Sequence, residues 1–310
     1  MSEKVLWKIM RRKRKEQKKK IIIIAALLLL SILAGMYAVK LAGKVAEDRR
    51  AAEAEAQAEA EAAAQQEAEA AAAAEAEAEA AKKSDSIYAY SGASGDAKYS
   101  LAAYDSAVEA GAGVIAVPFV VSQDGTLYVS DDDYAQELTG YGGYFSGMTD
   151  GQINNLETRS GAKVLKLSDV IDKYGKDIHY DIELKYTSER NLMALKELID
   201  KKDCADVVSI SSRYFNGLRS LDNELPDIPK IFICSSEEEW GEAMIHEFID
   251  SVSVSKEMMS ADYCKEAHDR NKKFGAWILN SEEEINTANE IGADFYYTDE
   301  AALAAGIEKE

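Results

Sequence analysis

The hydrophobic and polar positions divide the chain into three stretches of different character. The first is residues 21–39, nineteen consecutive uncharged residues that begin Ile-Ile-Ile-Ile-Ala-Ala-Leu-Leu-Leu-Leu. A helix of that length spans about 28 Å, which is close to the thickness of a hydrocarbon core. The pattern therefore predicts a single transmembrane helix. The alternative is a cleaved signal peptide, although this apolar run is longer than such peptides usually carry.

The second stretch is rich in alanine and glutamate. Residues 51–80 contain 18 Ala, 9 Glu and 3 Gln and no other residue. Both main residue types favour helix, and no Gly, Pro or β-branched residue interrupts the run. Because Leu, Ile and Val are missing from heptad core positions, a tight coiled coil is not expected. We predict a helical stalk, a semi-rigid spacer over residues 40–83, with a disordered acidic tether as the alternative.

The third stretch, residues 84–310, alternates short apolar runs with helical patterns. The expected strands are 87–90, 114–121, 126–130, 178–185, 207–211, 230–234, 251–255, 273–279 and 294–297. The expected helices are 101–110, 188–201, 236–248, 261–271 and 281–290. Alternation of this kind predicts a parallel sheet, and about eight repeats in roughly 225 residues fit an α/β fold of the (β/α)8, or TIM barrel, type. An open doubly wound sheet is the alternative, but no G-x-G-x-x-G follows the first strand.

Charge adds an orientation to this picture. The formal net charge is −20, yet residues 1–20 carry ten Lys or Arg against two Glu, and residues 84–310 carry 20 basic and 43 acidic residues. A basic tail directly before an apolar span predicts a single-pass protein of the cell membrane, with residues 1–20 cytoplasmic and residues 84–310 extracytoplasmic. The acidic body lacks a basic stripe, which argues against nucleic-acid binding. The three cysteines are too few and too scattered for a disulfide scaffold.

Several short segments occur in a telling order. Residues 100–104 read Ser-Leu-Ala-Ala-Tyr, residues 123–127 read Gln-Asp-Gly-Thr-Leu, and residues 182–185 read Ile-Glu-Leu-Lys, followed by Gly-Ala-Trp at 275–277 and Thr-Asp at 298–299. This ordered set covers nearly all of residues 84–310 and resembles the glycerophosphodiester phosphodiesterase family. The resemblance implies a barrel whose mouth holds a divalent cation and two catalytic histidines.

At the metal positions implied by the resemblance, this sequence departs from the family. The family's Glu-x-Asp on the second strand reads Ala116-Val117-Pro118 here, and these residues supply no side-chain oxygen. Glu183, from the family's Glu-Leu-Lys, remains, with Asp181 and Lys185 on the same strand face. Two interpretations stay open, namely an internal ion pair of Asp181 and Glu183 with Lys185, or the remnant of a metal site.

The catalytic positions depart in the same way. The family's two histidines read Tyr90 and Ser130, and its phosphate-contacting arginine reads Ser91. Neither Tyr nor Ser exchanges a proton near neutral pH as His does. The resemblance with these replacements predicts a pseudoenzyme that needs no cofactor and acts by binding or scaffolding. Its expected partners are the membrane, through one span, and an extracytoplasmic protein or small ligand.

The expected binding surface is the barrel mouth, with Tyr90, Glu183, Lys185 and Trp277, either Tyr128 or Ser130, and the loop 141–145. Aromatic residues with a lysine suit a sugar, a headgroup or a peptide, and the alternative is that these aromatics only pack in the core. The alternative function is an active phosphoric diester hydrolase of lipid metabolism. In that case Glu183, Asp181 and either Asp131 or Asp132 would hold Ca²⁺ or Mg²⁺.

Overall fold

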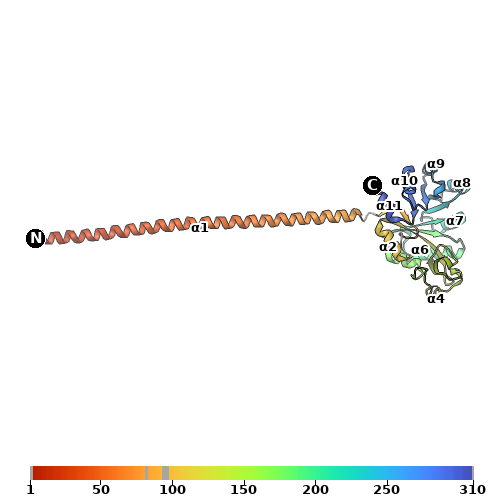
Figure 1. Cartoon of the computed structure of the whole chain (residues 1–310), viewed down its shortest axis with the longest axis horizontal. Helices are drawn as coiled ribbons and strands as arrows, with labels where there is room; N and C mark the ends of the chain where they lie inside the picture. Colours follow the sequence, from red (N-terminus) through yellow and green to blue (C-terminus); the bar gives the residue numbers. More distant parts are fainter. Residues whose placement is uncertain (1–2, 81–82, 93–97, 309–310) are drawn as a thin grey trace. The chain divides into compact units, whose positions relative to one another are not determined.

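The structure is a computed structural model that describes residues 3–80, 83–92 and 98–308, with the backbone alone for parts of the first helix. The described chain forms two compact units, Met1–Glu77 and Ala78–Glu310. Figure 1 shows the first unit as one continuous helix and the second as a group of strands surrounded by helices.

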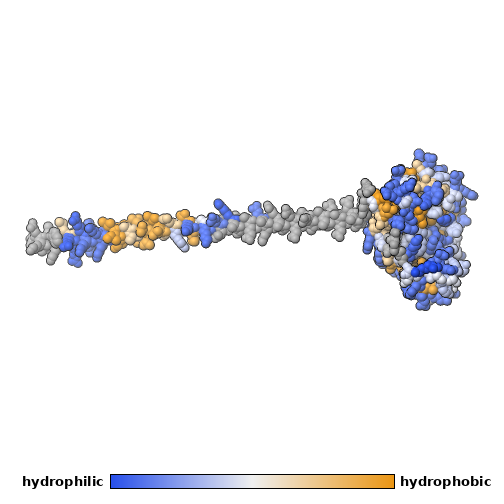
Figure 2. Space-filling model, in the orientation of Figure 1, coloured by the Kyte–Doolittle hydropathy of each residue, from blue (hydrophilic) through white to orange (hydrophobic). Residues whose placement is uncertain are grey.

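The first unit is helix α1, Glu3–Ala80. It contains a segment long and apolar enough to cross a membrane, and none of that segment is buried inside the protein. Figure 2 shows this apolar segment directly after a hydrophilic one. The helix continues through the Ala/Glu-rich residues without a break, so the predicted helix over 51–80 is confirmed.

The second unit is a closed barrel of eight parallel strands with helices around it, as predicted. The strands are β1 (Ser84–Ala89), β2 (Ala112–Val121), β4 (His179–Leu184), β5 (Val208–Ser212), β6 (Lys230–Cys234), β7 (Ser251–Ser255), β8 (Lys273–Trp277) and β9 (Phe295–Thr298). Strand β1 pairs with β9 on one side and with β2 on the other. This double pairing closes the sheet and excludes the open doubly wound alternative. Strand β3 (Leu127–Val129) returns antiparallel to β2 as a hairpin outside the parallel set.

The described α-helices of the barrel domain are α2 (Leu101–Ala110), α3 (Gln136–Thr139), α4 (Asp150–Ile153), α5 (Leu167–Tyr174), α6 (Glu189–Lys202), α7 (Phe215–Glu224), α8 (Glu237–Ile245), α9 (Ala261–Asp269), α10 (Glu282–Ile291) and α11 (Ala301–Glu308). The five predicted helices are present as α2, α6, α8, α9 and α10, and the other five described α-helices were not predicted. Three short 3-10 helices, η1 (Phe145–Gly147), η2 (Ala205–Val207) and η3 (Lys256–Met258), complete the described elements.

Helix α8 is shorter than predicted because its expected last residues serve another contact. The pattern predicts a helix to Phe248, but the helix ends at Ile245 and His246 is extended. The ammonium of Lys272 donates to the carbonyl oxygens of His246 and Ile249, at 2.7 and 2.5 Å. These hydrogen bonds satisfy carbonyls near the helix end and hold the chain in its turn toward β7.

The barrel interior is packed with aromatic rings. Tyr88 lies 4.7 Å from Phe295 and 5.1 Å from Tyr297, measured between ring centroids. Strand β8 leaves room for them at Gly275, where a Cβ would lie only 2.4 Å from the ring of Phe295. These aromatic rings fill part of the interior of the closed barrel.

Candidate functional site

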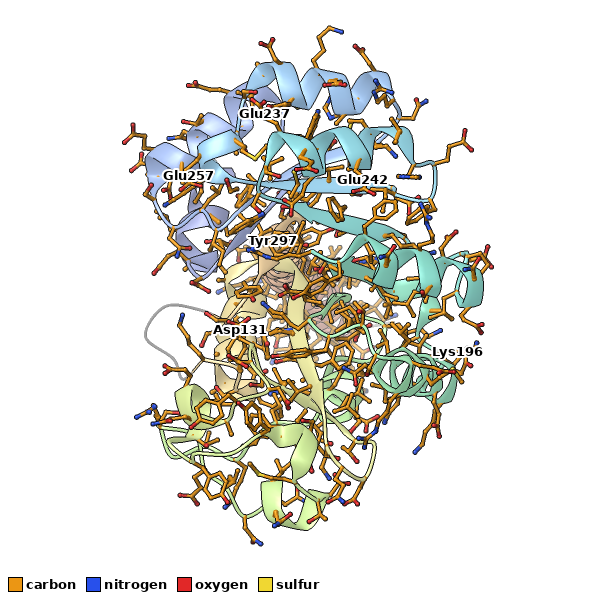
Figure 3. All side chains as sticks on the ribbon, turned by 90° about the vertical axis from the view of Figure 1, so that its right-hand side faces the viewer. Asp131, Lys196, Glu237, Glu242, Glu257 and Tyr297 are labelled. Carbon is orange, nitrogen blue, oxygen red and sulfur yellow. The ribbon has the colours of Figure 1, made fainter. Side chains whose placement is uncertain are left out.

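A cavity of about 210 Å³ lies at the mouth of the barrel. Its lining residues come from the carboxyl ends of the strands or directly follow them, which is where barrel enzymes place their functional side chains. They are Tyr90, Asp131, Glu183, Lys185, Arg213, Ile233, Trp277, Ile278 and Tyr297. Figure 3 shows Asp131 and Tyr297 in the central part of the view, whereas Lys196, Glu237, Glu242 and Glu257 lie around the periphery.

Four of these side chains form one connected network. The hydroxyl of Tyr90 lies 2.8 Å from Oδ1 of Asp131 and 3.0 Å from Oε2 of Glu183, and it shares its one proton between these two acceptors. The ammonium of Lys185 lies 2.6 Å from Oδ1 of Asp131 and 3.1 Å from Oε1 of Glu183. Both carboxylates are thus bridged twice, once by a phenol and once by a cation.

Burial and pairing act against each other on the charges of this network. Burial raises the pKa of Glu183, although Lys185 and the Tyr90 hydroxyl oppose the shift. Burial also acts to raise the pKa of Asp131, but hydrogen bonding and attraction from Lys185 outweigh it, and that pKa is lowered. The pKa of Lys185 is raised because, although burial favours the neutral amine, the two carboxylates favour the ammonium. The ammonium of Lys185 thus joins the carboxyl groups of Asp131 and Glu183.

This arrangement does not fit the divalent cation of the resembled family. Ca²⁺ and Mg²⁺ need several oxygen ligands that converge on one point. Here Ala116 and Pro118 supply no side-chain oxygen, and the carboxylates of Asp131 and Glu183 already face the ammonium of Lys185. Within residues 3–80, 83–92 and 98–308 no group of three or more His, Cys, Asp or Glu side chains is placed to hold a metal ion.

Asp181 lies deeper in the barrel than the cavity-lining network. Its carboxylate accepts hydrogen bonds from Ser211 at 2.7 Å, Tyr297 at 2.8 Å and Ser209 at 3.0 Å. Burial raises the pKa of Asp181 to about 7, although the three hydroxyl donors lower it in part. The predicted ion pair of Asp181 with Lys185 is therefore wrong, because Lys185 reaches outward to Asp131, which follows the β3 hairpin.

The other predicted site residues are divided between the mouth and the surrounding structure. Trp277 lines the cavity, and the guanidinium of Arg213 stacks 4.5 Å from the centre of its ring. Ser91 instead donates to Asp299 at 2.5 Å, and Ser130 donates to the carbonyl of Asp132 at 2.7 Å. Tyr128 is fully buried in a separate cluster, and its hydroxyl donates to Asn154. Contrary to the expectation, neither Tyr128 nor Ser130 is among the residues that line the mouth cavity.

Four cavity residues were not predicted from the sequence: Arg213, Ile233, Ile278 and Tyr297. All four lie near the carboxyl end of a predicted strand, so the strand pattern was the available signal. Three of them are apolar or aromatic residues that look the same in sequence as ordinary core residues. Only barrel closure determines that they face the mouth.

A larger groove of about 1040 Å³ lies outside the barrel, between the β2–β3 turn and helices α5 and α6. Three of its charged residues are engaged in structural contacts, since Lys196 pairs with Asp200 and Arg190 donates to the carbonyls of Ser122 and Gln123. The smaller mouth cavity, with its charged network around the buried Glu183, is the better candidate for a functional site.

Known structures share this architecture. A glycerophosphodiester phosphodiesterase from Thermotoga maritima is 19% identical with a TM-score of 0.61, and the match covers 73% of this chain and 98% of that one. One from Agrobacterium tumefaciens is 16% identical with a TM-score of 0.63, covering 74% and 100%. An Oleispira antarctica phosphodiesterase, in complex with the product sn-glycerol-3-phosphate, is 19% identical with a TM-score of 0.66, covering 72% and 96%.

These structural likenesses, at such low identity, show the fold alone. No curated protein matches the chain at a significant level. The model of the glycerophosphoryl diester phosphodiesterase family matches residues 91–303, which is more than half of the chain and includes most of the barrel strands and every mouth residue except Tyr90. By fold and by sequence, the chain therefore belongs to the glycerophosphoryl diester phosphodiesterase family.

Proposed function

We propose that this protein is a pseudoenzyme of its family, anchored in the cell membrane by one span, whose extracytoplasmic barrel acts by binding or scaffolding. The observation that carries the proposal is the Tyr90–Asp131–Glu183–Lys185 network. It sets a lysine cation between the two mouth carboxylates and a phenol across them. The family's two histidine positions hold Tyr90 and Ser130 instead, and burial raises the pKa of the Tyr90 phenol still further from neutral pH.

The cavity itself supports a binding role. Trp277 lines it, and the buried indole N–H of Trp277 has no hydrogen-bond acceptor among the described residues. Arg213 is stacked on that ring, and its guanidinium forms no ion pair with a carboxylate among the described residues. An indole donor, a guanidinium and the apolar side chains of Ile233 and Ile278 together suit a small ligand with hydrogen-bond acceptors. The proposal also includes a second kind of partner, a protein that binds at the mouth.

The proposed orientation and spacer role come from the first unit. Basic residues precede the apolar segment of α1, which favours a cytoplasmic N-terminus. The Ala/Glu-rich helix that follows would act as a spacer between the membrane and the barrel. It carries nine glutamates and no basic residue over residues 51–80, which disfavours close association between copies.

A turnover assay tests the loss of catalysis. The full chain in detergent is incubated with glycerophosphocholine and with a chromogenic phosphodiester, with Ca²⁺, with Mg²⁺ or with a chelator. We expect no turnover above the protein-free rate, while a family enzyme with its metal ligands intact is active under the same conditions. Turnover that needs the metal and disappears in Glu183→Ala would instead establish an active phosphoric diester hydrolase.

A further inference from the structure

Four exposed tyrosines gather beside the barrel mouth. Tyr134, Tyr141 and Tyr144 belong to the segment between β3 and α5, and Tyr186 directly follows Lys185 at the end of β4. Their side chains are 37%, 51%, 60% and 38% exposed, respectively. We call these four residues the tyrosine rim. Tyr134 and Tyr186 are both hydrogen-bonded to Asp132, next to Asp131, which lines the mouth cavity and is labelled in Figure 3.

The rings of the tyrosine rim are held in place although they are exposed. Tyr134 and Tyr144 form an antiparallel bridge, and their ring centroids are 5.1 Å apart. The ring of Tyr141 lies against Gly143, where a Cβ would be only 2.7 Å from that ring. The hydroxyl of Tyr186 donates to Asp132 at 3.0 Å and accepts from the backbone N–H of Asp133 at 3.0 Å. The rim is therefore a preorganised surface, which lowers the entropic cost of binding.

The four tyrosines of the rim are not needed to pack their segment onto the barrel. Phe145, next to Tyr144 in sequence, is completely buried and anchors the same segment in an apolar cluster. The neighbouring tyrosines leave much of their apolar area in water, and a contiguous group of exposed aromatic residues is typical of an interaction surface. Tyrosine is also among the residues that contribute most to binding energy at protein interfaces.

The charge around the rim selects the kind of partner. Asp131, Asp132 and Asp133 directly precede Tyr134. Lys185 pairs with Asp131, whereas Asp132 and Asp133 accept hydrogen bonds only from hydroxyl and backbone groups among the described residues. The tyrosine faces and these carboxylates both attract an ammonium or guanidinium group and disfavour an anion. The barrel domain, with 43 acidic and 20 basic residues, would also steer a basic partner toward it.

We propose that the tyrosine rim binds a Lys- or Arg-containing segment of a protein partner. The inference rests on the binding role proposed above and specifies its partner. It does not depend on whether the mouth hydrolyses a phosphodiester. Peptide titration therefore decides this inference, and the turnover assay decides the loss of catalysis.

The test measures binding of fluorescent octaarginine and octalysine to the full chain in detergent, at physiological salt. Because the Ala/Glu-rich segment is acidic as well, the decisive comparison is between variants that keep it. We expect Tyr141→Ala/Tyr144→Ala to weaken binding about tenfold through the loss of two cation–π contacts, and Tyr141→Phe/Tyr144→Phe to stay within about twofold. Thermal unfolding of each variant verifies that the barrel is intact.

A charge control separates the rim from general attraction. Glu224→Gln/Asp227→Asn removes two exposed negative charges at and after the carboxyl end of α7, the opposite end of the barrel from the mouth. We expect this variant to weaken peptide binding less than about twofold. The inference is overturned if the control loses as much affinity as the Tyr→Ala variant, or if the Tyr→Ala variant loses none. It is also overturned if cellotetraose, a neutral sugar, needs the two tyrosines while octaarginine does not.

Discussion

Asp181 and Glu183 lie two residues apart on β4 and face the same way, yet their surroundings differ. Glu183 meets a cation, Lys185, whereas Asp181 meets three neutral hydroxyl groups. Burial raises the pKa of Asp181 to about 7, and the three hydroxyl donors lower it only in part. A carboxyl group inside the barrel thus titrates near physiological pH.

Folding stability should reflect this titration. Because the folded-state pKa of about 7 exceeds the ordinary value of 3.8, Asp181 favours folding most below about pH 4, and this contribution is lost as the pH rises through 7. We expect Asp181→Asn to remove that dependence and to be more stable than the parent above pH 8, by about 2–4 kcal/mol. Chemical denaturation across this pH range measures it. The exposed Asp227→Asn serves as control, and parallel pH profiles for parent and Asp181→Asn would contradict the assignment.

Lys185 supplies the only positive charge that contacts both mouth carboxylates among the described residues. Lys185→Met would leave Glu183 buried without its cation, which we expect to reduce the free energy of unfolding by about 3 kcal/mol at neutral pH. The matched control is Lys196→Met, whose lysine has similar exposure but pairs with Asp200 on the surface of α6. Its expected loss is at most about 0.5 kcal/mol. Equal losses for the two variants, measured by urea denaturation, would show that the network does not stabilise the mouth.

Helix α7 depends on packing more than on its own sequence. Its segment includes Gly217, which favours helix poorly, but Leu218 and Leu221 are buried against the barrel. A Cβ at Gly217 would lie 2.5 Å from Cγ2 of Thr187 and 3.0 Å from Cδ2 of Leu184. The glycine therefore permits a close approach of α7 to the end of β4.

A pair of glycine variants tests this close approach. We expect Gly217→Ala to destabilise the protein by about 1–3 kcal/mol, because the methyl group has no space. Gly241→Ala in α8, where no atom lies within 4 Å of the added Cβ, should stabilise it by up to about 1 kcal/mol. Thermal unfolding of both variants makes the comparison. If Gly217→Ala leaves the stability unchanged, α7 can move away from β4 at little cost in free energy.

Helix capping separates the five predicted helices from two of comparable length that were not predicted. All five helices predicted in the barrel domain begin after a serine whose side chain accepts a backbone N–H in the first turn: Ser100, Ser188, Ser236, Ser260 and Ser281. Helices α5 and α7, which were not predicted, begin after Lys166 and Tyr214 without such a hydrogen bond. A local cap leaves a readable signal, whereas helices formed by tertiary packing leave little.

The site likewise has features that could be predicted from the sequence and features that could not. Tyr90, Glu183, Lys185 and Trp277 could be placed at the mouth because each lies at the end of a predicted strand and in a segment that resembles the family. The pairing of Lys185 with Asp131 could not be predicted, because it depends on how the β3 hairpin folds back across β2. Lys185 and Asp131 lie far apart in the sequence, and only the folded barrel brings them into contact.

At the scale of the whole molecule, the apolar segment of α1 should determine where the protein resides. We expect the full chain to stay in the membrane fraction after high-salt and alkaline washes. Leu28→Arg/Ile32→Arg should shift it to the soluble fraction, since each arginine costs about 2.5–3.5 kcal/mol at the centre of a span. Gln57→Arg, outside the apolar segment of the same helix, is the control. Retention of the double variant in the washed membrane would contradict a role for this segment in anchoring.

Closure of the barrel has a consequence for the membrane-anchored protein proposed above. Membrane anchoring concentrates copies, and concentrated copies with open sheet edges tend to polymerise by sharing strands. Here β1 pairs with both β9 and β2, so the eight parallel strands leave no edge unpaired. Strand β3 has a free side, but it is only three residues long and Tyr128 already bridges to Lys166 there. Many neighbouring copies can therefore crowd together and remain separate molecules.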